Sequence, residues 1–256
     1  MAQGSSAGQL LAELDDVLNG RASALVPVGN DDSALAALRV GEEIDDDIAL
    51  VVTTSGTTGT PKGAQLTAAA LTASADATRD RLGGPGRWLL ALPSYHIAGI
   101  QVLVRSLLAG TVPVELDVSA GFDINQLPSA VDELGPGRRY TALVATQLAK
   151  ALDDPAATAA LAGLDAVLIG GGPAPRPVLD GAARAGVNVV RTYGMSETAG
   201  GCVYDGVPLD GGTASSRRRR PDRARRPDAG QGLSQCTRPR PVRRAGLVPH
   251  RRHWRR

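Results

Sequence analysis

The most constraining feature of this chain is a segment from Thr53 to Gly63 with the sequence T-T-S-G-T-T-G-T-P-K-G. Glycine turns backbone N–H groups toward an anion without steric cost, hydroxyl groups add donors, and lysine adds a positive charge. The apolar run Ile48–Val52 before it predicts a buried strand, and the residues from Leu66 onward predict a helix. The segment therefore predicts a phosphate-binding loop between a strand and a helix.

The nearest rival pattern is the P-loop, G-x-x-x-x-G-K-[ST], in which a hydroxyl residue directly after the lysine binds magnesium. Here Lys62 follows Pro61 and precedes Gly63, so that hydroxyl residue is missing and the P-loop is excluded. A flexible linker without a ligand is the other alternative. It is disfavoured because such linkers seldom lie between an apolar strand and a helix.

Composition bounds the class of protein. The 256 residues are 43% hydrophobic and 21% charged, enough for a sizeable core in one or two globular domains. The two cysteines, Cys202 and Cys236, provide no disulfide framework. We find no apolar segment of membrane-spanning length and no start typical of a signal peptide. We therefore expect a cytoplasmic, soluble protein with no membrane partner.

Charge divides the chain into two unlike regions. Residues 1–216 carry a net charge of −11, whereas residues 217–256 hold 15 arginines against two aspartates, a net charge of +13. An arm with this arginine density could bind nucleic acid by neutralising phosphates. We prefer a different explanation, given below, and expect no nucleic-acid partner.

From Ala49 to Thr192, apolar runs alternate with helical patterns, which favours a mostly parallel sheet with crossover helices. Strands are predicted near 48–53, 88–91, 111–115, 140–144, 166–169 and 187–192. Helices are predicted near 66–82, 97–109, 124–134, 145–152 and 175–185, with a further short helix near 10–18.

Three more motifs follow predicted strands. In Pro93–Gly99, P-S-Y-H-I-A-G, His96 lies at a helix start, where it either meets a substrate carboxylate or only satisfies its own ring nitrogens. Gly170–Gly172 follow a strand, and residues without side chains there let a flat ligand approach the backbone, although tight helix packing is an alternative. Thr192–Thr198, T-Y-G-M-S-E-T, contains an aromatic side chain of the kind that suits a purine and a carboxylate of the kind that a hard cation prefers. Taken alone, a Tyr-Gly turn with an exposed Glu is unremarkable.

Together these motifs resemble those of the adenylate-forming enzymes, the superfamily of acyl-CoA synthetases and firefly luciferase. Residues 55–63 match its S-G-T-T-G-x-P-K-G pattern, and residues 193–198 match Y-G-x-[ST]-E-T. The resemblance implies an α/β fold corresponding to part of the N-terminal domain of such an enzyme. It implies a short N-terminal region at 1–48 and an AMP-binding core at 49–212. The Arg/Pro-rich composition of residues 213–256 predicts a disordered tail, interpreted below as frame-shifted.

The resemblance also implies residue roles. Residues that would bind the nucleotide are Thr54, Ser55, Gly56, Thr57, Thr58, Gly59, Lys62, Gly171, Gly172, Tyr193, Gly194 and Ser196. Lys62 and Glu197 would act in catalysis, with Glu197 as the Mg²⁺ ligand. His96, Gly171 and Thr198 would line the acid pocket. ATP, Mg²⁺ and coenzyme A, the last as a substrate, follow as cofactors. The second lysine, which the family carries on a C-terminal domain, has no match here.

The arginine-rich tail is interpreted as a frame-shifted translation, because arginine and proline dominate out-of-frame readings of GC-rich DNA. Permitted codons for Leu247–Arg255 can spell W-F-R-T-D-D-I-G one nucleotide later, and those for Arg226–Arg255 can spell a longer string that contains K-G-Y. This string resembles the K-G-Y…G-W-F-x-T-G-D region that follows the adenine-binding motif in the superfamily. The hypothesis places the lesion between about Gly211 and Arg220.

Within the superfamily, the short N-terminal region and the motifs over residues 10–212 resemble the CoA ligases that activate an aromatic dicarboxylate in menaquinone biosynthesis. A ligase for another aryl or fatty acid, a non-functional fragment and a basic nucleic-acid-binding protein are the alternatives. We expect weak or absent ligase activity from the chain as printed, because the ribose-binding aspartate and the C-terminal lysine of the family have no match. Small-molecule substrates are the expected partners, and homo-oligomerisation stays open.

Overall fold

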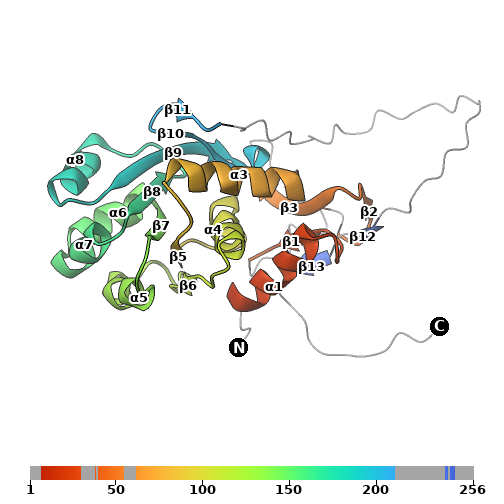
Figure 1. Cartoon of the computed structure of the whole chain (residues 1–256), viewed down its shortest axis with the longest axis horizontal. Helices are drawn as coiled ribbons and strands as arrows, with labels where there is room; N and C mark the ends of the chain where they lie inside the picture. Colours follow the sequence, from red (N-terminus) through yellow and green to blue (C-terminus); the bar gives the residue numbers. More distant parts are fainter. Residues whose placement is uncertain are drawn as a thin grey trace, which may run out of the picture.

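The structure, a computed structural model, describes residues 7–29, 38, 40–54, 62–210, 240–241 and 243–245. It has an α/β fold whose larger sheet has the strand order β11-β10-β9-β8-β7-β5-β6 (Figure 1). Its parallel strands are β5 (Arg87–Leu90), β6 (Val114–Glu115), β7 (Arg139–Val144), β8 (Ala166–Gly170) and β9 (Val189–Met195). At one edge, β10 (Gly200–Tyr204) and β11 (Val207–Pro208) are added antiparallel.

Helices cover both faces of this sheet (Figure 1). On one face lie η1 (Ile124–Gln126), α5 (Leu127–Glu133), α6 (Ala145–Leu152), α7 (Pro155–Ala162) and α8 (Arg176–Arg184). On the other face lie α3 (Ala68–Arg81) and α4 (Ile97–Leu108). The prediction of strands alternating with crossover helices is therefore confirmed for this part of the chain.

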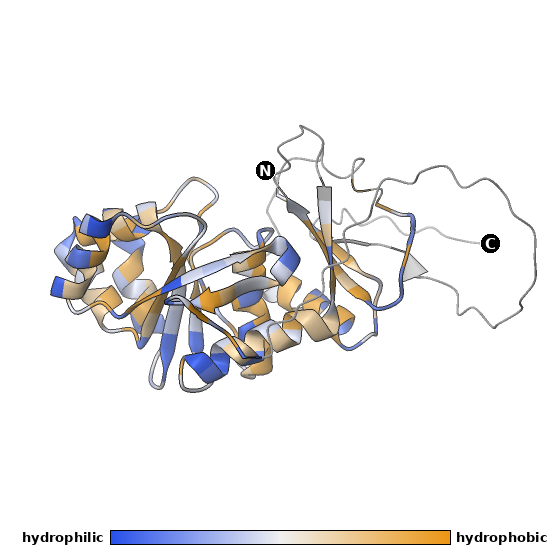
Figure 2. Cartoon of the chain, turned by 90° about the horizontal axis from the view of Figure 1, so that it is seen from above, coloured by the Kyte–Doolittle hydropathy of each residue, from blue (hydrophilic) through white to orange (hydrophobic). Residues whose placement is uncertain are grey.

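The two faces follow from side-chain alternation along the strands. In β8, Ala166 and Leu168 belong to one buried cluster with α3 and α4, whereas Val167 and Ile169 belong to the cluster formed with α5–α8. Successive residues of a strand point to opposite faces, so an apolar run without polar interruptions indicates burial on both sides. Figure 2 shows hydrophobic residues along the strands and along the helices packed against them.

A second sheet lies beside the first and has the order β13-β1-β3-β4. It is built from β1 (Leu25–Pro27), β3 (Ile48–Thr54), β4 (Lys62–Thr67) and β13 (Arg243–Ala245). A separate pair joins β2 (Glu43–Ile44) to β12 (Arg240–Pro241). The sequence pattern did not predict this division into two sheets. The predicted disorder of the tail concerns residues that lie outside the described residues, apart from β12 and β13.

The predicted helix from Leu66 onward is wrong in its first residues, because residues 62–67 form β4. Ala64 and Leu66 are buried while Gly63, Gln65 and Thr67 are half-buried, the period of two that a strand requires. The helix begins at Ala68, where the Thr67 hydroxyl oxygen accepts a 3.1 Å hydrogen bond from the Ala70 backbone N–H.

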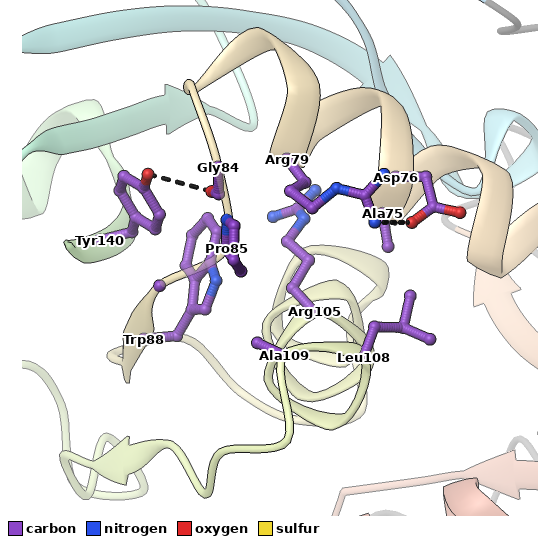
Figure 3. Close-up of a pocket in the computed structure, with 11 residues that line it drawn as sticks. Ala75, Asp76, Arg79, Gly84, Pro85, Trp88, Arg105, Leu108, Ala109 and Tyr140 are labelled. Atoms are coloured by element: carbon purple, nitrogen blue, oxygen red, sulfur yellow. Dashed lines mark hydrogen bonds and ion pairs between the residues drawn. The ribbon is translucent and has the colours of Figure 1, made fainter. Parts of the chain in front are cut away.

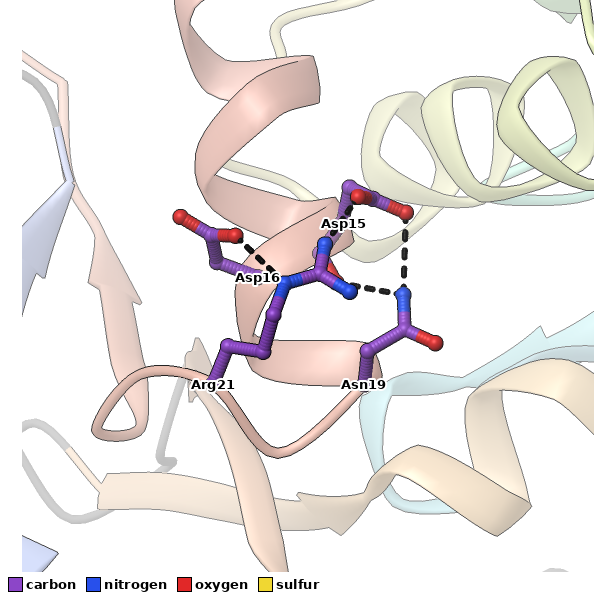
Figure 4. Close-up of polar contacts among 4 residues, drawn as sticks. All are labelled: Asp15, Asp16, Asn19 and Arg21. Atoms are coloured by element: carbon purple, nitrogen blue, oxygen red, sulfur yellow. Dashed lines mark hydrogen bonds and ion pairs between the residues drawn. The ribbon is translucent and has the colours of Figure 1, made fainter.

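Helix α1 (Ala7–Leu18) packs Leu10, Leu14 and Val17 into the buried cluster that contains residues of both sheets. Arg21, just after its end, makes ion pairs with Asp16 at 2.9 Å and with Asp15, and the Asn19 side chain contacts Asp15 as well (Figure 4). These groups are exposed, so they order the turn and add little stability. No helix in the described ranges is long and apolar enough to cross a membrane.

Candidate functional site

The threonine/glycine segment lies at the end of an antiparallel hairpin. Strands β3 and β4 pair from Ile48 with Thr67 to Thr54 with Lys62, so the backbone ends at Thr54 and Lys62 lie opposite each other. The residues between them include Ser55, Gly56, Thr57, Thr58 and Gly59, which lie outside the described residues, and their phosphate-binding role stays a prediction. Because β4 follows this segment, the expected arrangement of a loop between a strand and a helix is wrong, and the segment instead connects two antiparallel strands.

The hairpin contacts the second predicted motif, far away in the sequence. Tyr193 and Gly194 belong to β9, which ends at Met195, and the short helix η2 (Ser196–Thr198) follows directly. η2 packs against both β3 and β4. The fold therefore places Glu197 next to the strands that flank the threonine/glycine segment. A ligand that contacts both motifs would require this proximity.

The turn that carries Glu197 is held by its own hydrogen bonds. The Thr198 hydroxyl accepts a 3.0 Å hydrogen bond from the Met195 N–H and lies 2.7 Å from the Gly200 carbonyl oxygen. A Cβ on Gly194 would lie only 2.0 Å from that same Gly200 oxygen. Gly194 thus permits the close β9–β10 pairing, and Thr198 shapes the turn. Contact of either residue with a ligand stays a prediction.

Two side chains of the motif suit a nucleotide and its metal. Tyr193 is 62% exposed, so its ring is accessible for stacking. Glu197 is half-buried in η2. Within the described ranges no three His, Cys, Asp or Glu side chains gather as a metal cluster. A single carboxylate at this place fits magnesium, which proteins bind through one or two carboxylates together with substrate phosphates.

The glycine motif lies beside this turn, at the end of the neighbouring strand. Strands β8 and β9 are parallel, and Ile169 pairs with Arg191. Gly170–Gly172 and η2 therefore both lie where the carboxyl ends of these parallel strands meet, which is the edge meant below. Gly171 has φ +78°, a conformation that favours glycine, and a Cβ on Gly172 would meet no atom within 4 Å. Gly172 therefore leaves open space beside the backbone.

His96 lies at the same edge, since β5 runs parallel to β7 and β8. It precedes α4 and is exposed, and its ring centroid lies 4.6 Å from that of Tyr95. Partial desolvation lowers the pKa of His96 below its ordinary value of 6.5. Gly99 lets the helix approach the preceding turn, because a Cβ there would lie 2.3 Å from the Pro93 oxygen.

Sequence reasoning missed two glutamines that connect this edge. The Gln147 side chain accepts from the Val144 N–H at 2.9 Å and donates to the Ala91 oxygen at 2.8 Å, joining the ends of β7 and β5. Gln101, buried in α4, donates to the Ala199 oxygen just after η2. A lone amide in the apolar helix sequence I-A-G-I-Q-V-L-V was the available signal for Gln101.

The cavities found among the described residues lie elsewhere. One, of about 20 Å³, lies between α3 and α4 beside Trp88, Arg105 and Tyr140 (Figure 3). A larger hollow of about 360 Å³ lies between α1, β3 and α3 next to Asp45–Asp47. Neither cavity is lined by a predicted site residue. The case for the site therefore depends on the shared ends of the strands and on the contacts of η2.

Comparison with known proteins settles the family. Residues 9–245 match the AMP-binding enzymes. The chain belongs to the AMP-binding enzyme family. It is 74% identical over 209 residues to a probable 2-succinylbenzoate–CoA ligase of Mycobacterium tuberculosis, covering 81% of this chain and 55% of that protein. A 2-succinylbenzoate–CoA ligase of Geobacillus is 36% identical over 158 residues, 60% of this chain and 31% of that protein.

Solved structures confirm the α/β fold of this AMP-binding chain. The O-succinylbenzoate coenzyme A synthetase of Bacillus subtilis in complex with AMP has a TM-score of 0.54 and 32% identity, over 63% of this chain and 33% of that one. The same enzyme with ATP and magnesium ion has a TM-score of 0.54 and 27% identity, over 78% and 44%. The chain thus spans about half the length of the Mycobacterium tuberculosis relative.

Proposed function

We propose that this chain is the nucleotide- and acid-binding part of an ATP-dependent 2-succinylbenzoate–CoA ligase. The observation that carries the proposal is the packing of η2, with Glu197, against both strands of the β3–β4 hairpin. The 74% identity to the probable ligase of Mycobacterium tuberculosis supports the choice of acid. A ligase for another aryl acid is the competing outcome of the test below.

The proposed nucleotide site uses groups from both motifs. Hydroxyl and backbone N–H groups of residues 54–59, with the ammonium of Lys62, would bind the triphosphate. Tyr193 would stack on adenine, and Ser196 would contact the α-phosphate. Glu197 would hold magnesium, which offsets phosphate charge when bound. Such a site would act mainly by positioning and charge neutralisation, because its donors would be held in place before the reaction.

The acid would bind at the edge where His96, Gly171 and Thr198 lie. A carboxylate oxygen of the acid attacks the α-phosphorus of ATP, the bond to the bridging oxygen breaks, and pyrophosphate leaves. In the second reaction the coenzyme A thiol sulfur attacks the acyl carbon, the thiol proton is lost, and AMP leaves. A neutral His96, favoured by its lowered pKa, can donate one hydrogen bond to a carboxylate of the acid.

The first test is nucleotide binding by the chain itself, since we expect its ligase activity to be weak. Calorimetric titration with ATP and MgCl₂ should give binding that falls roughly tenfold or more in Lys62→Ala and in Glu197→Gln. Binding that is unchanged in the double variant would contradict the proposal. Asp205→Asn is the matched control for loss of one carboxylate, because Asp205 follows the end of β10 that is opposite to η2.

The second test concerns the acid. Pyrophosphate exchange into ATP should depend on 2-succinylbenzoate, measured both with the chain and with the product of a gene whose upstream reading frame is restored between about Gly211 and Arg220. Exchange that depends on benzoate or on a fatty acid, and not on 2-succinylbenzoate, would assign the competing ligase activity.

A further inference from the structure

Gln101 is a buried amide that joins two parts of the site. It lies in α4 and is only 1% exposed. Its Nε2 donates hydrogen bonds to the Ala199 oxygen at 2.8 Å and to the Leu71 oxygen of α3 at 3.2 Å. A buried amide that makes two such bonds fixes the groups it contacts, because each bond would be costly to lose.

The contact falls at the most constrained point of the turn. Ala199 has φ 54°, a left-handed conformation that is uncommon for residues other than glycine. A Cβ on the next residue, Gly200, would lie 3.1 Å from Cγ of Gln101, so the backbone passes directly over this side chain. The chain reverses direction here so that β10 pairs antiparallel with β9. The Gln101 side chain hydrogen-bonds to the backbone at this reversal.

His96 is the N-cap residue of the same helix. Helix α4 runs from Ile97 to Leu108, so His96 precedes its first turn and Gln101 lies one turn further on. Through Gln101, this helix is hydrogen-bonded to the Ala199 carbonyl, two residues from Glu197.

We propose that Gln101 is a positioning residue that fixes the turn carrying Glu197 and couples it to the helix whose N-cap residue is His96. The consequence for magnesium rests on the proposed function, whereas the consequence for the turn does not. Without the Gln101 donor, the turn is expected to open more often and the Glu197 carboxylate to sample positions that do not bind the metal.

Hydrogen exchange of the whole chain tests the positioning role without any ligand. Gln101→Met keeps an unbranched side chain of similar length and removes the donor, and Gln101→Leu is a second variant. Thr141→Val is the matched control, because the buried Thr141 hydroxyl donates at 3.1 Å to the Leu89 oxygen within the large sheet. The Met195 and Ala199 amides, which hydrogen-bond inside the turn, report on opening.

We expect these two amides to exchange roughly three- to tenfold faster in both Gln101 variants and at the original rate in Thr141→Val, as for removal of one buried hydrogen-bond donor. Unchanged exchange at Met195 and Ala199 would overturn the proposal. So would loss of folding in both variants, since a residue that only positions the turn is not needed for the fold.

Nucleotide titration separates this inference from the proposed function. We expect Gln101→Met to lower ATP affinity roughly tenfold with MgCl₂ and by less than about twofold with EDTA. An equal loss under both conditions would overturn the link to Glu197. If the original chain bound no ATP at all, the proposed function would fail, and the exchange experiment alone would decide the role of Gln101.

Discussion

The side chain of Thr192 occupies the space that a Cβ on Gly170 would need. The Thr192 hydroxyl donates a 3.2 Å hydrogen bond to the Ile169 oxygen, and its Oγ1 would lie 2.6 Å from a Cβ at position 170. Gly170 is thus required for the packing of β8 against β9. Gly172, two residues on, has open space around it. The glycines of this motif therefore serve different purposes.

Gly170→Ala should destabilise the fold, because either Thr192 or the β9 backbone must move to accept the methyl group. We expect a loss of about 1–3 kcal/mol in the free energy of unfolding, the usual cost of overpacking. Urea denaturation followed by far-UV circular dichroism measures it. Gly170→Ala combined with Thr192→Ser, which removes a methyl group but keeps the hydroxyl, should recover little, because the oxygen is the clashing atom.

Gly172→Ala should leave stability within about 0.5 kcal/mol of the original, since the new methyl group meets no atom. If a flat ligand approaches this backbone, the same methyl group should lower ATP affinity, which calorimetric titration measures. Unchanged ATP binding in Gly172→Ala would show that the open space does not belong to the nucleotide site.

Tyr193 allows a similar separation of stability from binding. The residue is 62% exposed, so Tyr193→Ala should change the free energy of unfolding by no more than about 0.5 kcal/mol. Loss of an aromatic ring that stacks on a base should cost about 1–3 kcal/mol of binding free energy. Tyr204→Phe is the control, because its hydroxyl lies 3.0 Å from that of Thr78 in the core and away from the site. A Tyr193→Ala variant with normal ATP affinity would exclude stacking.

The sequence predicted the parts of this fold that depend on local pattern. Buried runs such as Ala166–Ile169 have no polar interruption, and the helices between them have recognisable limits, so strand and helix order could be read directly. The motifs that follow β5, β8 and β9 converge because parallel strands end at one edge. That geometry could be anticipated from the order of elements alone.

What could not be predicted depends on contacts between distant residues. Residues 62–67 contain two glycine or alanine positions and a glutamine, a weak strand pattern, and they form β4 because β3 supplies the pairing partner. The contact between Gln101 and Ala199 spans 98 residues, and no local pattern identifies it. The division into two sheets has the same origin, since strand pairing is a long-range choice.

His96 should make stability depend on pH in a defined direction. Its folded pKa is lowered, so between that value and the ordinary 6.5 the unfolded state binds more protons, and stability must fall as pH drops below about 6.5. His96→Gln should remove this slope in urea midpoints measured from about pH 5 to pH 8. His253→Gln is the control, because that histidine lies in the arginine-rich tail. A slope that persists in His96→Gln would contradict the assignment.

Arg105 should be replaceable by methionine without loss of stability. Its guanidinium is buried and lies 5.0 Å from the Trp88 ring centroid, with hydrogen bonds to Thr78 and Tyr204 at 3.2 and 3.4 Å. Within the described part of the chain no carboxylate forms an ion pair with it, and its Nε has no partner. Burial lowers its pKa, the sign of a charge held at a cost in free energy.

The two hydroxyls that bond Arg105 also bond each other at 3.0 Å, and that of Thr78 donates to the Ser74 oxygen, so both stay satisfied after the charge is removed. A methionine keeps the apolar stem beside Trp88 and loses the cation–π attraction, while the desolvation cost disappears. We expect the free energy of unfolding of Arg105→Met to rise by about 0–2 kcal/mol. Arg105→Ala should instead lose about 2–4 kcal/mol, because it enlarges the neighbouring cavity. A methionine variant that is much less stable than the original would show that water in this cavity compensates the charge.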